Sequence, residues 1–100
     1  MDGVSTELLA SVKLALSVTV NAYDAEITDL IEAAIKDLEN VLGKEVDPDD
    51  PLIKQAIKTY VRMSFRSPAD YDRLRASYEA QRGTLRISSG YTEWEVDDDG

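Results

Sequence analysis

Hydrophobic residues recur at intervals of three and four through most of this chain, which is the spacing of one buried face of an α-helix. The clearest run lies between residues 24 and 42. Its apolar positions are Ile27, Leu30, Ile31, Ala34, Ile35, Leu38, Val41 and Leu42. Asn21 or Asp24 can cap the start of this run, and Gly43 stands where a left-handed C-cap belongs. The pattern predicts a long amphipathic helix through the core.

Shorter runs of the same kind predict one helix before this run and one after it. Ser5 or Thr6 can cap the first, whose helical spacing stops near Leu16, where a β-branched stretch follows. Asp50 followed by Pro51 is a strong start signal for the next, because aspartate accepts from free backbone N–H groups and proline suits the first helical position.

The last quarter of the chain begins as a helix and continues as an apolar segment. Ser67–Pro68 repeats the cap-and-proline signal, and Gly83 is expected to end the fourth helix. Beyond it, Thr84–Ser88 alternates polar and apolar residues with the period of a single strand. We therefore expect an all-α bundle of four helices over residues 1–83, with the second and third at its centre, and an extended C-terminal arm over residues 84–100.

An arm that carries aromatic side chains is typical of a surface that binds another protein, because tyrosine and tryptophan offer large contact areas. A lone strand also has no partner within an all-helical domain, so it can pair with another chain. We predict that Leu85, Ile87, Tyr91 and Trp94 contact a partner protein.

Charges are distributed unevenly along the chain. Residues 1–50 hold 12 acidic and 3 basic residues, residues 51–92 hold 3 and 8, and residues 93–100 hold 5 acidic residues and no basic one. This polarity is either chance clustering on solvated faces or the mark of head-to-tail packing between identical subunits.

Within the basic part, Lys54, Lys58, Arg62 and Arg66 follow one another at spacing four, so they form one row along the third helix. Such a row is either a solvated face or a subunit interface. In the second case it would meet an acidic surface of an adjacent copy, supplied by its second helix or by its acidic end.

The composition excludes most kinds of catalysis. The chain has no cysteine and no histidine, which removes thiolate nucleophiles, Ser–His–Asp catalysis and the commonest zinc ligands. Asp47, Asp49 and Asp50 resemble the start of a calcium loop, but its sixth and twelfth positions are Leu52 and Lys58 instead of glycine and glutamate. We expect no enzyme activity, no metal site and no cofactor.

Nucleic acid and membranes are also disfavoured partners. A net charge of −9 opposes contact with phosphates. Arginines and tyrosines do alternate between residues 71 and 91, so single-stranded nucleic acid stays an alternative partner. No apolar run approaches the roughly 20 residues that a membrane span needs, and the first residues lack a secretion signal.

Several short sequence motifs follow one another along the chain in an order that is similar to that of a known protein family. They are Asp-x-Glu-Ile-x-x-Leu-Ile-x-x-Ala at 24–34, Leu42-Gly43, Pro51-x-Ile53-x-x-Ala56, Tyr60 with Arg66, Tyr78-Glu79-Ala80-Gln81, Leu85 and Ser89-Gly90-Tyr91-Thr92. Over residues 5–94 the chain resembles the small head–tail connector proteins of long-tailed phages and prophages, some of which are labelled DNA-packaging proteins.

The resemblance implies an all-helical virion protein, made in the bacterial cytoplasm, that forms a ring of about a dozen copies at the head–tail junction. Such a ring docks beneath the portal protein, extends the DNA channel and receives a tail-side completion protein. By position, the arm would hold the portal or a neighbouring subunit. The alternative is a small soluble regulatory module that binds one protein or peptide.

Overall fold

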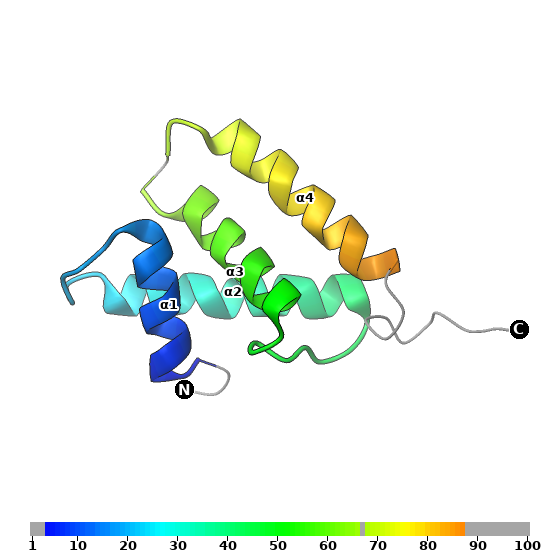
Figure 1. Ribbon diagram of the computed structural model, residues 1–100, viewed down its shortest axis with the longest axis horizontal. Helices are drawn as coiled ribbons and strands as arrows, with labels where there is room; N and C mark the ends of the chain where they lie inside the picture. Colours follow the sequence, from blue (N-terminus) through cyan, green and yellow to red (C-terminus); the bar gives the residue numbers. More distant parts are fainter. Residues whose placement is uncertain (1–3, 67, 88–100) are drawn as a thin grey trace, which may run out of the picture.

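The computed structural model describes residues 4–66 and 68–87, and these residues form four α-helices and no strand (Figure 1). The helices are α1 (Thr6–Leu16), α2 (Asp24–Leu42), α3 (Pro51–Ser64) and α4 (Tyr71–Ile87). The all-α class and the four helices expected from the sequence are therefore confirmed.

Helix α3 is the element on which the others meet. It packs against α1, α2 and α4, whereas α1 and α4 do not contact each other within the described residues. Figure 1 shows α2 crossing behind α1 and α3, while α4 returns alongside α3. The second and third helices thus form the centre of the bundle, as the sequence predicts.

The core is built from one apolar side of each helix. Its buried members are Leu8, Val12, Ile27, Ile31, Ala34, Leu38, Leu42, Ile53, Ala56, Ile57, Val61, Tyr78 and Leu85. Full burial of a large aliphatic side chain stabilises a fold by about 1.5–3 kcal/mol, so these positions supply most of the driving force for folding.

Two predicted helix starts and one predicted end are present. The Ser5 side chain accepts a hydrogen bond from the backbone N–H of Leu8 at 3.0 Å, which caps α1. The Asp50 carboxylate accepts from the N–H of Leu52 at 2.9 Å and precedes Pro51 at the start of α3. Gly43 ends α2 with a φ of 77°, a left-handed conformation that glycine adopts without strain.

The start of α2 differs from the prediction. Tyr23 occupies the N-cap position and makes no side-chain capping bond, and Asp24 is already the first helical residue. Asn21 does not cap the helix either. Its side-chain oxygen accepts a hydrogen bond from Lys13 at 3.0 Å, so this residue joins the loop to α1 instead.

The expected end of α4 at Gly83 is wrong. The helix begins at Tyr71, three residues after Pro68, and continues through Gly83 to Ile87. Residues 84–87 are therefore helical, and the boundary proposed between a domain ending at 83 and an arm falls inside a helix. The part of the expected arm from residue 88 lies outside the described residues.

Burial of Leu85 explains why the helix passes through a glycine. The side chain of Leu85 is 1% exposed and belongs to the core. A helical glycine costs about 1 kcal/mol relative to alanine. Burying a leucine contributes about 1.5–3 kcal/mol, so the tertiary contact outweighs the local preference of Gly83.

Replacing Gly83 by alanine should stabilise the protein by about 0.5–1 kcal/mol, because alanine favours a helix more strongly. An added Cβ there meets nothing within 4 Å. Gly43→Ala is the matched control and should destabilise by about 1 kcal/mol or more, because its φ is positive. Urea unfolding followed by helical circular dichroism measures both. Equal losses in the two variants would contradict the continuous helix.

The last turn of α4 permits a second paired comparison. Leu85→Ala should lower the free energy of unfolding by about 2–5 kcal/mol, because it leaves a cavity in the core. Ile87→Ala, at a side chain that is 84% exposed, should change it by less than about 0.5 kcal/mol. Thermal and urea unfolding give both values. A Leu85→Ala variant as stable as the parent would mean that this residue lies outside the core.

Candidate protein-interaction surfaces

The described residues contain no group of three or more carboxylate side chains placed to hold a metal ion. None of the described helices combines the length and the apolar character that crossing a membrane requires. Three features of the described surface instead offer chemistry for binding other molecules. They are an apolar groove on α1, a basic row on α3 and the exposed end of α4.

The apolar groove lies between α1 and the segment that follows it. Its volume is about 440 Å³, and its apolar wall consists of Leu9, Ala10, Leu14 and Val18, which we call the α1 groove. The Leu14 side chain is 81% exposed, the most exposed leucine of the described chain. An apolar recess of this kind binds apolar side chains of another molecule.

A polar cluster holds one edge of the α1 groove in place. The ammonium group of Lys13 lies 2.8 Å from the carboxylate of Asp24 and 3.0 Å from the side-chain oxygen of Asn21. Only 14% of the Lys13 side chain is exposed, so this ion pair is less screened by water than an ordinary surface pair. The cluster fixes the start of α2 against α1 and forms the polar edge of the groove.

Sequence reasoning missed the α1 groove, although one signal for it was present. The helical spacing of the first helix places Leu8, Leu9, Val12, Ala15 and Leu16 on one apolar stripe. A further leucine, at position 14, falls off this stripe. An aliphatic residue outside the core-facing stripe of a short helix indicates a second apolar face.

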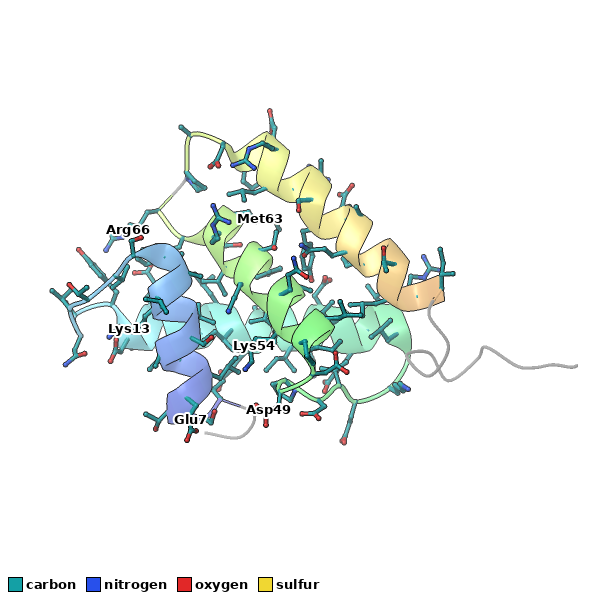
Figure 2. All side chains as sticks on the ribbon, in the orientation of Figure 1. Glu7, Lys13, Asp49, Lys54, Met63 and Arg66 are labelled. Atoms are coloured by element: carbon teal, nitrogen blue, oxygen red, sulfur yellow. The ribbon has the colours of Figure 1, made fainter. Side chains whose placement is uncertain are left out.

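The basic row is defined here as Lys54, Lys58 and Arg62, and Lys54 marks its first turn in Figure 2. These side chains follow one flank of α3, beside the core positions Ile57 and Val61, and only Arg62 is exposed. None of the three forms an ion pair with any residue of the described chain. The structure thus places three of the four predicted interface residues along one flank of α3, with Lys54 and Lys58 half-buried and Arg62 exposed.

The fourth predicted member, Arg66, does not belong to this row. Helix α3 ends at Ser64, and Arg66 has a φ of 63°, so the helical spacing no longer applies to it. Its guanidinium lies 4.3 Å from the centre of the Tyr23 ring and 3.8 Å from the Glu26 carboxylate. Arg66 therefore links the end of α3 to the start of α2.

A second contact that the sequence did not reveal joins α4 to α2. The phenol of Tyr78 donates a hydrogen bond of 2.6 Å to the Asp37 carboxylate, across 41 positions of sequence. Arg82 Nε lies 3.7 Å from the same carboxylate oxygen. The Tyr78 ring also packs edge-on against Tyr60, with ring centres 5.3 Å apart.

Burial raises the pKa of the Tyr78 phenol far above its ordinary value near 10, because the phenolate would lose its hydration. The hydrogen bond to Asp37 and the negative charge of that carboxylate raise this pKa further, while Arg82 opposes them. Tyr78 is thus a neutral, hydrogen-bonded core residue that locks the two helices together.

The exposed end of α4 agrees only in part with the predicted partner-binding set. Ile87 is 84% exposed, as a docking residue requires. Leu85 is buried, so its expected exposure is wrong: the helix rotates this side chain into the core. Tyr91 and Trp94 lie outside the described residues.

The free energy of unfolding should fall above about pH 10 by up to about 1.4 kcal/mol per pH unit through Tyr78. The sign follows from the raised pKa, since the unfolded chain loses this proton near pH 10 while the folded chain retains it. Tyr78→Phe should remove that part of the slope. Urea unfolding of both proteins between pH 8 and pH 11 measures it, and an unchanged slope in the variant would contradict the assignment.

Comparisons of the chain with protein-family models, with curated proteins and with solved structures find no match. No relative therefore assigns a role to the α1 groove, the basic row or the end of α4.

Proposed function

We propose that this chain is a structural adaptor of the phage head–tail junction. Its copies form a ring that docks beneath the portal protein and continues the DNA channel toward the tail. The observation that carries the proposal is the presence of exposed apolar surface at two separate ends of one protomer, the α1 groove and Ile87.

The positions of these two surfaces favour contact between copies of the chain. Figure 1 shows α1 at one end of the helical body and the C-terminal end of α4 at the other. Two different surfaces at opposite ends produce a head-to-tail contact, in which one copy's α4 end meets the next copy's α1 groove. Contacts of this heterologous type close into rings when the rotation between subunits allows it.

The basic row supports the same arrangement through charge. Lys54, Lys58 and Arg62 have no ion-pair partner among the described residues, while the chain as a whole carries a net charge of −9. An acidic surface of the adjacent subunit can pair with this row. Complementary charges of this kind set register and partner choice more than they set affinity.

The resemblance described above makes this adaptor a head–tail connector in particular. Its motifs at residues 24–34, 42–43 and 51–56 fall on α2, on the C-cap of α2 and on the first turns of α3. In this proposal, Ile87 together with Tyr91 and Trp94 contacts the portal or a neighbouring subunit.

The α1 groove also favours a second candidate, a regulatory module that binds a peptide. A recess of about 440 Å³ with four apolar wall residues is large enough for one or two side chains of a short segment. Such a module would stay at one or two copies whether or not a portal is present, which separates it from a ring-forming connector.

Mixing the chain with the portal protein of the same phage should give a ring of about a dozen copies attached to the portal. Size-exclusion chromatography with light scattering and negative-stain microscopy measure this. Ile87→Asp should abolish attachment while helicity is retained, because it places a charge in an apolar contact.

Tyr71→Asp is the matched control for that variant. Tyr71 is 41% exposed at the opposite end of α4, and an acidic residue suits the first turn of a helix, so attachment should be unchanged. A parent chain that remains at one or two copies in the presence of portal would overturn the connector proposal and favour the regulatory module.

A further inference from the structure

We infer that the basic row is the docking site of the chain's own acidic tail, defined as residues 93–99, within the isolated subunit. The tail contains Glu93, Glu95, Asp97, Asp98 and Asp99. This inference concerns the free chain and does not depend on the connector proposal.

The charges of the two segments are complementary. The row presents three cations on one face of α3, and no described residue pairs with them. The tail has five carboxylates, and residues 93–100 contain no basic residue. A single exposed ion pair is weak and salt-sensitive, whereas several pairs formed together hold a segment in place.

The tail also leaves the helical body near one end of the row. Thr84 and Leu85 of α4 and Leu52 and Gln55 of α3 line a common recess, so the last turns of α4 lie beside the first turns of α3. Lys54, the first member of the row, lies on those same turns of α3. The chain beyond Ile87 therefore starts at the same end of the α3–α4 pair as Lys54, which lies on the other flank of α3 from this recess.

The length of the chain beyond Ile87 suits this docking. Glu93 is six residues past Ile87, so an extended chain places it up to about 20 Å away. The row from residue 54 to residue 62 is about 12 Å long, at about 1.5 Å per helical residue. The six residue steps between Glu93 and Asp99 span up to about 20 Å, which covers the whole row.

Attachment to the same chain favours this tail over the tail of another copy. A short flexible linker gives the tail an effective concentration in the millimolar range at the row, well above the concentration of a dilute sample. Because the pairs are exposed, a more strongly acidic surface on a partner can displace the tail.

A nitroxide spin label on the tail tests the inference. The chain has no cysteine, so Gly100→Cys provides one labelling site and leaves all five tail carboxylates in place. In a ¹⁵N-enriched sample at low salt, the amide signals of residues 54–62 should be broadened more than those of α2. The broadening should disappear at about 1 M salt, where the Debye length is only about 3 Å.

The triple variant Lys54→Gln, Lys58→Gln, Arg62→Gln should abolish this broadening. Lys36→Gln is the matched control, because Lys36 is an exposed lysine on α2 that also has no ion pair among the described residues, and it should retain the broadening. Should the triple variant fail to fold, a chain with the five tail acids changed to Gln and Asn, and the same label, gives the equivalent comparison.

A mixed sample separates docking within one chain from docking between chains. It combines one chain that carries the spin label but no ¹⁵N with a second chain that is enriched in ¹⁵N and carries no spin label. Signals of residues 54–62 should stay sharp in this mixture. Broadening there, or broadening in the labelled chain that survives neutralisation of the row, would overturn the inference. Absence of broadening in the labelled parent chain would do the same.

Discussion

The structure depends on the burial of one side of α3 against three helices at once. Ile53, Ile57 and Val61 lie in the core, and α3 contacts α1, α2 and α4. A helix enclosed in this way can present polar side chains to water only over the remaining arc. Arg62 lies within that arc and the half-buried Lys54 and Lys58 lie at its edge, so the packing that stabilises the fold also determines where the basic row meets water.

The sequence was sufficient to predict the helices and caps at which the local signals and the requirements of the core agree. The cap at Asp50, the left-handed Gly43 and the apolar stripe of α2 all point to the same structure that the core requires. At Gly83 the two disagree, and burial of Leu85 decides the outcome. Alternation over residues 84–88 looked like a strand because a run of five residues is too short to separate the two periods.

The candidate sites were less predictable, because they depend on contacts between distant residues. No local pattern places the Tyr78 phenol on the Asp37 carboxylate, 41 positions away. The spacing of four correctly joined the first three members of the basic row but included Arg66, since periodicity does not report where a helix ends. The position of Leu14 outside the core-facing stripe indicated a second apolar face, but the groove around it also requires Val18 and the start of α2.

Exposed apolar ends and a large net charge act in opposite directions in this chain. The α1 groove and Ile87 favour association, whereas a charge of −9 makes identical copies repel one another. Association becomes favourable only where acidic and basic surfaces meet, because pairing then removes the repulsion while apolar area is buried. The basic row is the part of the described surface best suited to that pairing. In the proposed ring, an acidic surface of the adjacent copy that pairs with this row would let the apolar ends come together.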